Sequence, residues 1–242
     1  VRLLKEQGYK EVILLGQNVN AYGKDLNINY TLANLLEDVA KTGIERIRFI
    51  TSHPWDFSDE MIHIIKKYPN VLNHIHLPVQ SGNNDILKLM GRRYTKEEYI
   101  NLYQKLKKEI PNISITTDII VGFPGETNKQ FEDTLSLVEE CKFDLAYTFI
   151  FSKRVGTPAY NMKDEVTKEE KEERLQRLNE LINKYALINN KKLINKEENV
   201  LVEGFSSKNS DLLMGYTETN KLVNFKGDSS LIGKIVKVKI LD

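Results

Sequence analysis

Short apolar runs alternate with helical patterns through the first part of the chain. The runs have the length of strands, and the segments between them carry apolar residues at helical spacing. Five such runs lie at 11–16, 46–51, 74–79, 113–122 and 145–151. Near-continuous apolar strands separated by helices are typical of a parallel sheet that helices cover. The pattern therefore predicts an α/β fold, as either a doubly wound sheet or part of a β/α barrel.

Capping signals predict where the helices begin. A threonine followed three positions later by Glu or Gln forms a capping box, because each side chain bonds the backbone N–H of the other residue. Such boxes pair Thr95 with Glu98, Thr127 with Gln130, and Thr167 with Glu170, while Thr31 and Ser58 precede two further helices. The last box opens a long helix whose apolar positions share one stripe, at Leu175, Leu178, Ile182 and Tyr185.

The pattern changes to short strands near Asn199. The runs VLVEGF, LLMGYT, KLVNF and KIVKVKI are separated by Gly, Asn and Ser turns. Several short strands with such turns predict a small closed β-barrel. We therefore expect a barrel-like core at 1–165, a linking amphipathic helix at 166–192 and a small β-barrel at 193–242.

Composition and charge are ordinary for a soluble chain. The 242 residues are 40% hydrophobic and 29% charged, with a formal net charge of +1, so any basic surface must be local. No apolar stretch approaches the roughly 20 residues of a membrane helix, and no secretory signal is present. A single cysteine, Cys141, excludes disulfide bonds within the chain and favours the reducing cytoplasm.

Polar residues follow each of the five predicted strands. Parallel sheets and barrels bind ligands at the carboxyl ends of their strands, where these residues should meet. They are Gln17 and Asn18; Ser52, His53 and Pro54; Gln80, Ser81 and Gly82; Asp118 with the segment 122–125; and Ser152, Lys153 and Arg154. A carboxylate such as Asp118 accepts two hydroxyls, and an arginine such as Arg92, Arg93 or Arg154 grips a carboxylate. This set favours a nucleoside that carries an amino-acid tail.

A metal site is an alternative interpretation of the same residues. His74 and His76 share one face of a strand, His53 ends the neighbouring strand, and imidazole is a common ligand of zinc and iron. Such a site would make the chain a metal-dependent hydrolase or aldolase, although no carboxylate flanks the pair. Nucleophilic catalysis by Cys141 and nucleotide binding by a P-loop have no supporting motif.

Several long motifs, in order, make the chain similar to a known family. The segments EVILLGQNVNAYG, FITSHPWDFSDEMI, HIHLPVQSGNNDILKLMGRRYT and SITTDIIVGFPGET resemble the radical S-adenosylmethionine methylthiotransferases. The C-terminal VLVEGFSSKN, GYTETNKLVNF and LIGKIVKVKI resemble the TRAM domain that ends those enzymes and is held to bind RNA. The resemblance spans nearly the whole chain. It implies a partial β/α barrel of the radical S-adenosylmethionine type, followed by a small TRAM β-barrel.

The resemblance also implies an activity. Within the family, the motifs are more similar to the tRNA-modifying enzymes than to those that act on a ribosomal protein. The expected reaction adds a methylthio group to N6-isopentenyladenosine next to the anticodon. The expected partner is tRNA, bound through its anticodon stem-loop, and proteins that donate sulfur and electrons are further candidates. A sister enzyme for N6-threonylcarbamoyladenosine and a non-catalytic RNA-binding barrel protein remain alternatives.

The resemblance assigns cofactor-binding roles residue by residue. Gln17 and Asn18 would meet the amino group of S-adenosylmethionine, and Arg92, twelve residues after Gln80, would hold its carboxylate. Gln80 and Asp118 would hold the ribose, and Ser52 would lie near the methionine group. Gly122 and Gly125 would let the backbone approach the adenine. The whole set is Gln17, Asn18, Ser52, Gln80, Ser81, Arg92, Asp118 and Gly122.

The family's cluster-binding cysteines have no counterpart in this chain. The resemblance implies two [4Fe–4S] clusters in the intact enzyme, held by a C-x3-C-x2-C loop and three further cysteines, whereas this chain has only Cys141. Its opening residues, VRLLKEQGYK, read as the end of a helix that Gly8 terminates. We therefore expect the chain to be cut from a longer protein and to be catalytically inactive alone.

The TRAM-like segment carries seven lysines and seven acidic residues, so it is not basic overall. We expect its lysines to gather on one side of the barrel and to contact RNA phosphates. They are Lys208, Lys221, Lys234 and Lys237, with Lys226 and Lys239. The alternative is that these lysines solvate strand faces and block edge pairing.

Overall fold

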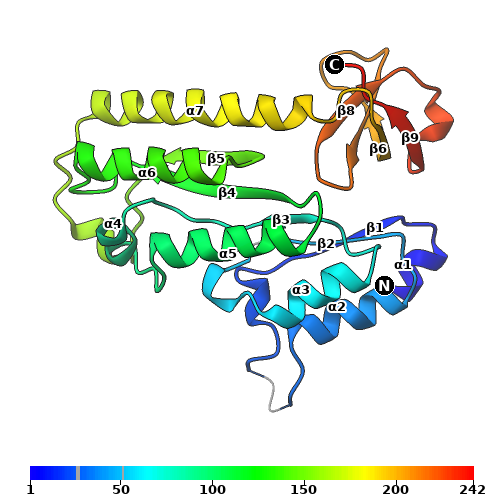
Figure 1. Cartoon of the computed structure of the whole chain (residues 1–242), viewed down its shortest axis with the longest axis horizontal. Coiled ribbons are helices and arrows are strands. Elements are labelled where there is room, and N and C mark those ends of the chain that lie inside the picture. The colour runs from blue at the N-terminus through cyan, green and yellow to red at the C-terminus, as the bar shows by residue number, and fades with distance from the viewer. Residues whose placement is uncertain (26–27, 51) are drawn as a thin grey trace.

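Five parallel strands lie side by side in chain order in the computed structural model, which describes residues 1–25, 28–50 and 52–242 (Figure 1). The pairs are β1 (Glu11–Leu14) with β2 (Arg46–Phe49), β3 (His74–His76) with β4 (Ser114–Val121), and β4 with β5 (Leu145–Ile150). The two sheets are joined because Ile47 N–H donates to Asn70 O at 2.8 Å and Ser52 N–H donates to His76 O at 3.2 Å. The predicted partial β/α barrel is confirmed.

β3 ends three residues before the end of the predicted run 74–79. Pro78 has no N–H, so it cannot continue a ladder of hydrogen bonds. The chain still runs beside β4, since Leu77 N–H donates to Thr116 O and Gln80 N–H donates to Asp118 O, both at 2.8 Å. Thr51, the last residue of the predicted run 46–51, lies outside the described residues.

The longer helices begin where the capping signals predict. α2 (Leu32–Lys41), α3 (Asp59–Lys67), α5 (Lys96–Glu109), α6 (Asn128–Cys141) and α7 (Lys168–Lys191) follow Thr31, Ser58, Thr95, Thr127 and Thr167. The shorter helices are α1 (Arg2–Glu6), α4 (Asn84–Leu89), η1 (Val19–Ala21), η2 (Pro54–Asp56), η3 (Pro158–Asn161) and η4 (Ser229–Leu231). Across the described ranges, none of the helices combines the length and the apolar character needed to cross a membrane.

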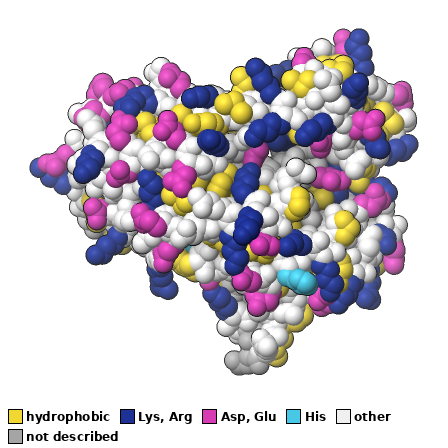
Figure 2. Space-filling model, in the orientation of Figure 1, with side chains coloured by type: hydrophobic (Ala, Val, Ile, Leu, Met, Phe, Trp, Pro, Cys, Tyr) yellow, Lys and Arg dark blue, Asp and Glu magenta, His cyan; other side chains and the backbone are white. Residues whose placement is uncertain are grey.

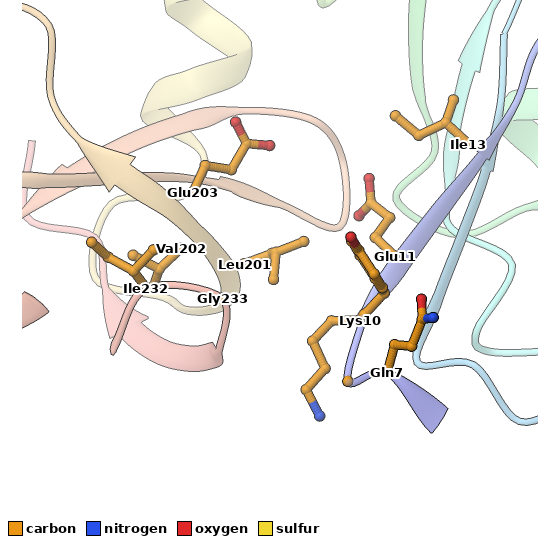
Figure 3. Close-up of a pocket in the computed structure, with 11 residues that line it drawn as sticks. Gln7, Lys10, Glu11, Ile13, Leu201, Val202, Glu203, Ile232 and Gly233 are labelled. Carbon is orange, nitrogen blue, oxygen red and sulfur yellow. The ribbon is translucent and has the colours of Figure 1, made fainter. Parts of the chain in front are cut away.

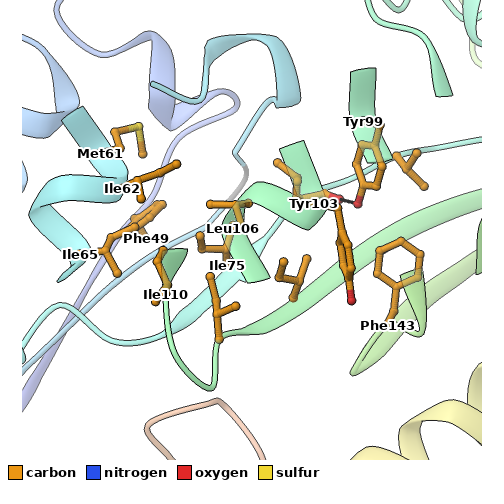
Figure 4. Close-up of a cluster of buried hydrophobic side chains, with 14 of the residues drawn as sticks. Phe49, Met61, Ile62, Ile65, Ile75, Tyr99, Tyr103, Leu106, Ile110 and Phe143 are labelled. Carbon is orange, nitrogen blue, oxygen red and sulfur yellow. Dashed lines mark hydrogen bonds between the residues drawn. The ribbon is translucent and has the colours of Figure 1, made fainter. Parts of the chain in front are cut away.

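The core lies between the strands and the helices α3 and α5 (Figure 4). Phe49, Ile75 and Leu106 are completely buried there, and burying a side chain of this size contributes roughly 1.5–3 kcal/mol. Two buried tyrosines also carry hydrogen bonds. Tyr99 Oη donates to Leu77 O at 2.8 Å, and Tyr94 Oη donates to Val79 O at 3.0 Å. These bonds fix the segment that leads from β3 to Gln80.

α7 lies along α6 and β5 and leads to the C-terminal strands (Figure 1). Leu178 and Ile182 are buried, and Leu175 and Tyr185 pack partly buried against the core, which confirms the predicted stripe. The strands β6 (Glu197–Phe205), β7 (Leu213–Thr217), β8 (Leu222–Phe225) and β9 (Ile235–Lys239) form one antiparallel sheet in the order β8-β7-β6-β9. A Cβ on Gly215 would lie 2.2 Å from Leu201 O, so a glycine is needed for β7 to approach β6.

Two buried arginines of β2 join the barrel to the C-terminal sheet. Arg46 donates from Nη2 to Asn199 O of β6 at 2.6 Å, and Arg48 donates from Nη2 to Thr217 O of β7 at 2.7 Å. Glu11 of β1 accepts from Arg48 Nε at 2.8 Å. Because these charges are buried, they need such partners, and the carbonyl oxygens of the sheet supply them.

Candidate functional site

Asp118 and Gln80 meet at the carboxyl ends of β3 and β4. Gln80 N–H donates to Asp118 O at 2.8 Å, and Ile120 N–H donates to Gln80 O at 2.9 Å. Gln80 has a φ of +72°, a conformation that costs a residue with a side chain roughly 1–3 kcal/mol and that concentrates at functional sites. The carboxylate of Asp118 remains 27% exposed. Two predicted cofactor-binding residues thus lie side by side, and their contact with ribose stays a prediction.

Ser52, His53 and Arg92 each have a buried polar atom after β2, and we use the name rim pocket for these three residues. Within the described part of the chain, Ser52 Oγ, His53 Nδ1 and Arg92 Nε have no hydrogen-bond partner. Arg92 Nη1 lies 3.2 Å from His53 Nε2. Burial, and then the charge of Arg92, lowers the pKa of His53 to about 4, so the imidazole is neutral and its Nε2 can accept. A buried polar atom without a partner costs roughly 1–3 kcal/mol, so the rim pocket suits a polar ligand.

The turn after α4 brings Arg92 to the rim pocket. Gly91, with φ +72°, ends the helix, and the next N–H, that of Arg92, donates to Leu87 O at 2.8 Å. This is the hydrogen-bond pattern of a glycine-terminated helix. Asn83 caps the other end, since its Oδ1 accepts from the N–H groups of Asp85 and Ile86. The twelve-residue spacing from Gln80 to Arg92 is therefore one short helix with its two caps.

Asn18 lies beside the turn that carries His53. Its Nδ2 donates to Asp56 Oδ2 at 2.6 Å, and Lys24 forms an ion pair with the same carboxylate. Asn18 Oδ1 is buried and lacks a partner among the described residues. Gln17 is exposed. Asn18 therefore has a free acceptor near the rim pocket, whereas the role of Gln17 stays a prediction.

Ser81 and Gly122 have packing contacts besides their predicted roles. Ser81 is completely buried, and its Oγ lies 3.4 Å from Thr134 Oγ1 of α6. Gly122 has a φ of +68°, and a Cβ there would lie 2.3 Å from Cγ of Lys171 in α7. The Lys171 side chain thus fills the space beside Gly122. These contacts explain both residues by packing, and their cofactor roles stay predictions.

Glu126 and Arg174 support the glycine turn and were not singled out from the sequence. Glu126 Oε2 accepts from Gly122 N–H at 2.7 Å and from Arg174 Nη1 at 3.0 Å. Burial raises the pKa of Glu126, and the bonds from Gly122 and Arg174 oppose that rise. The signal in the sequence was the acidic residue that closes GFPGET, but its buried partner in α7 lies 48 residues away.

The histidines do not form part of a metal centre in the described ranges. No group of three or more His, Cys, Asp or Glu side chains there is placed to hold a metal ion. His74 and His76 instead share Thr116. Cys141 is buried, and burial raises the pKa of its thiol to about 12. An iron–sulfur cluster needs several thiolates, so it does not fit the one cysteine of this chain.

The predicted RNA-binding lysines do not share one environment. The Lys221 side chain is only 15% exposed, and its Nζ lies 3.0 Å from Asp144 Oδ1 of the core. Lys237 is exposed, and its Nζ lies 3.5 Å from Glu197. Lys208, Lys226, Lys234 and Lys239 are also exposed. On the face shown in Figure 2, basic and acidic side chains are interspersed. Lys221 therefore joins the C-terminal sheet to the core, and the phosphate contacts of all these lysines stay predictions.

A groove of about 720 Å³ lies between the start of β1 and the C-terminal sheet (Figure 3). Lys10, Glu11 and Ile13 line one side, and Leu201 and Glu203 line the other. Glu11 already accepts a hydrogen bond from Arg48. The groove lies at the opposite ends of the strands from Asp118, so we do not place the ligand there.

Comparison with known proteins agrees with this arrangement. Residues 1–138 match the radical SAM superfamily, and residues 191–242 match the TRAM domain. The tRNA-2-methylthio-N(6)-dimethylallyladenosine synthase of Bacillus cytotoxicus is 57% identical over 243 residues, covering 100% of this chain and 48% of that protein. The enzyme of the same name from Staphylococcus haemolyticus is 56% identical, covering 99% of this chain and 47% of that protein.

The chain thus spans about half the length of the curated relatives it matches. Among solved structures, coproporphyrinogen III oxidase from Escherichia coli has a similar fold, with a TM-score of 0.52 at 15% identity. That likeness covers 79% of this chain and 55% of the oxidase chain. The parallel strands, the polar residues at their carboxyl ends and the match over residues 1–138 lead to one conclusion: the chain belongs to the radical SAM superfamily.

Proposed function

We propose that this chain forms the cofactor-binding core and an RNA-binding end of a tRNA methylthiotransferase. The whole enzyme would add a methylthio group to N6-isopentenyladenosine next to the anticodon. The observation that carries the proposal is the rim pocket, where polar atoms of Ser52, His53 and Arg92 are buried without partners among the residues that the structure describes. The names of the relatives at 57% and 56% identity support the choice of reaction.

S-adenosylmethionine fits the donors and acceptors at the rim. When bound, it supplies the methyl group and the radical chemistry of the superfamily. Arg92 would bind its carboxylate, Ser52 would donate to the same end, and Asn18 Oδ1 would accept from its ammonium group. These contacts would satisfy atoms that otherwise remain buried and unpaired.

The ribose would lie next to the rim pocket. Asp118 would accept its hydroxyl groups and Gln80 would complete that contact, because both residues lie at the carboxyl ends of adjacent strands. The turn at Gly122, which Glu126 holds through the Gly122 N–H, would border the adenine, with Ser81 supporting the strand end from inside. Gln17 would contact the amino group from its exposed position.

An exposed aromatic side chain beside the rim pocket suits an RNA base. Trp55 is 40% exposed and stacks on His53, with 3.6 Å between the ring centroids. The guanidinium of Arg93 lies 5.5 Å from the Trp55 ring. Unpaired bases stack on aromatic rings and on arginine planes, and phosphates bind lysines such as Lys208 and Lys234. We therefore propose the anticodon stem-loop of tRNA as the partner.

We propose three consecutive parts of the chain with different roles. Residues 1–165 would form the cofactor-binding core and residues 166–192 the linking helix. Residues 193–242 would form the TRAM domain. The match of residues 191–242 to that domain supports the last boundary. Arg174 and Lys171 show that the helix also contacts the glycine turn of the core.

The test uses the full-length protein, reconstituted anaerobically and incubated with tRNA that carries isopentenyladenosine or threonylcarbamoyladenosine. Mass spectrometry of the digested tRNA should show a methylthio group on isopentenyladenosine alone. Asp118→Asn should lose this product, whereas Asp85→Asn, an exposed residue of α4, should keep it. Product on threonylcarbamoyladenosine alone would establish the sister activity instead. No product on either tRNA would overturn the proposal.

A further inference from the structure

A line of polar side chains in contact crosses the inner face of the barrel between β3 and β4. His74 Nε2 lies 3.3 Å from Thr116 Oγ1, and His76 Nδ1 lies 3.0 Å from the same oxygen. His76 Nε2 then lies 3.3 Å from Asp118 Oδ1. His76 pairs with Thr116 in the strand register, and alternate residues of a strand share a face, so all four side chains point the same way.

The number of protons on these side chains determines which residue donates and which accepts in each hydrogen bond. Burial, followed by the charge of Arg48, lowers the pKa of His74 to about 3, so His74 is neutral and carries one N–H. If that proton were on Nδ1, a buried donor would have no partner, because Nδ1 has none among the described residues. The proton therefore belongs on Nε2, where it donates to Thr116 Oγ1.

The rest of the line follows from that assignment. Thr116 has one hydroxyl proton and two acceptor lone pairs, so its oxygen can accept from His74 Nε2 while its hydroxyl donates to His76 Nδ1. When the His76 ring carries a single proton, that proton is then on Nε2, 3.3 Å from Oδ1 of Asp118, where it attracts the carboxylate. The opposite direction would place a lone pair of His76 against a carboxylate oxygen, which is repulsive.

We propose that His76 is a positioning residue: its Nε2–H, 3.3 Å from Oδ1 of Asp118, attracts that oxygen, and the second carboxylate oxygen stays available to a ligand at the rim. Thr116 and His74 act behind it by setting the tautomer of His76. The ring of Tyr147, which faces Asp118 across the β4–β5 pair, packs edge-on against His76 with 5.7 Å between the centroids and limits its rotation. The effect on the cofactor rests on the proposed function, in which Asp118 accepts a ribose hydroxyl.

Two matched pairs of variants separate positioning from packing. His76→Gln keeps an N–H donor at the position of Nε2, whereas His76→Leu keeps the volume and removes the donor. Thr116→Ser keeps the hydroxyl, whereas Thr116→Val replaces it with a methyl group. If either residue acted only by packing, the binding affinity would depend on the volume of the side chain. In the proposed role, the affinity depends on whether the hydrogen-bond donor is kept.

The measurement is calorimetric binding of S-adenosylmethionine, and of its analogues lacking one ribose hydroxyl, to the full-length, cluster-loaded protein. His76→Leu and Thr116→Val should weaken binding of S-adenosylmethionine by about tenfold, the size expected for a bond to a charged group. His76→Gln and Thr116→Ser should stay close to the unchanged protein. For the analogue that lacks the hydroxyl bound by Asp118, all four variants should bind like the unchanged protein.

Equal losses in His76→Leu and His76→Gln, or equal losses for S-adenosylmethionine and both analogues, would overturn the positioning role. If the unchanged protein binds S-adenosylmethionine and both analogues equally, the ribose contact of the proposed function fails. The histidine line is then tested by NMR of the protein labelled with 15N-histidine. Spectra showing His76 protonated on Nδ1 alone would contradict the line, and protonation on Nε2 would support it.

Discussion

Arg48 in β2 donates a hydrogen bond of 2.7 Å from Nη2 to the carbonyl oxygen of Thr217 in β7, and both residues are buried. The bond connects the second strand of the barrel to the C-terminal sheet, across 169 residues of sequence. Lys221 and Asp144 add an ion pair between the same two parts. The C-terminal sheet is therefore held against the barrel by buried charges, which gives any RNA-binding surface on it a fixed position relative to Asp118.

Replacing Arg48 by Met should lower the free energy of unfolding by about 3 kcal/mol, because Glu11, whose side chain is 14% exposed, would lose its nearest partner and the buried Thr217 O would lose its donor. Chemical denaturation followed by circular dichroism measures the change. Arg2→Met, on the exposed helix α1, is the matched control and should be neutral. An Arg48→Met protein as stable as the control would show that this bond does not hold the sheet.

The stability of the protein should decrease as the pH is lowered, because of His74. Its pKa is lowered to about 3, chiefly by burial, whereas histidine in an unfolded chain titrates near 6.5. The unfolded state therefore binds more protons between these values. The stability contributed by neutral His74 is complete above pH ~6.5 and is lost as the pH falls, by up to roughly 1.4 kcal/mol per unit.

His74→Gln should flatten this part of the profile of unfolding free energy against pH. His63→Gln, on the exposed side of α3, is the control. Parallel profiles for the unchanged protein and His74→Gln would show that His74 does not cause the loss.

Two glycines of the turn after β4 give a matched comparison. Gly122 and Gly125 both have positive φ, at +68° and +80°, so alanine at either position strains the backbone by about 1 kcal/mol. A Cβ at Gly122 would also press against Lys171, whereas no atom of the described residues lies within 4 Å of a Cβ at Gly125. Gly122→Ala should therefore lower the free energy of unfolding, measured by thermal unfolding, by a further ~1–3 kcal/mol. Equal costs would mean that Lys171 moves away freely.

Trp55→Ala should weaken binding of the anticodon stem-loop by about 1–3 kcal/mol, the contribution of one stacked base. Fluorescence anisotropy of the full-length protein with a labelled stem-loop measures it. Tyr9→Ala removes an aromatic ring that is 58% exposed at the start of β1, and it should have no effect. A similar loss in both variants would argue against a specific stacking site at Trp55.

Much of the fold could be predicted because local signals and tertiary packing agree. The three predicted capping boxes, the five apolar runs and the apolar stripe of α7 all appear in the structure. The exceptions have local causes. Pro78 shortens β3, and α4 is too short to show a helical period, although Asn83 and Gly91 cap it. The order β8-β7-β6-β9 could not be predicted, since strand pairing depends on contacts distant in sequence.

The sequence predicted which residues lie at the carboxyl ends of the strands. It did not predict which of their side chains contact one another. Asp118 and Gln80 could be placed together because both follow from strand positions. The pairing of Arg92 with His53 could not, since it depends on the turn that ends α4. The ion pair of Lys221 with Asp144 could not be predicted, because the two residues lie 77 positions apart in the sequence.

We propose that the carboxyl ends of the strands, from the rim pocket to Asp118, hold S-adenosylmethionine. The most direct measurement is calorimetric binding of S-adenosylmethionine to the full-length, cluster-loaded protein and to its Asp118→Asn variant. We expect the variant to lose about 1–3 kcal/mol of binding free energy, because a carboxylate that accepts ribose hydroxyls becomes a neutral amide. The same affinity in both proteins would contradict it.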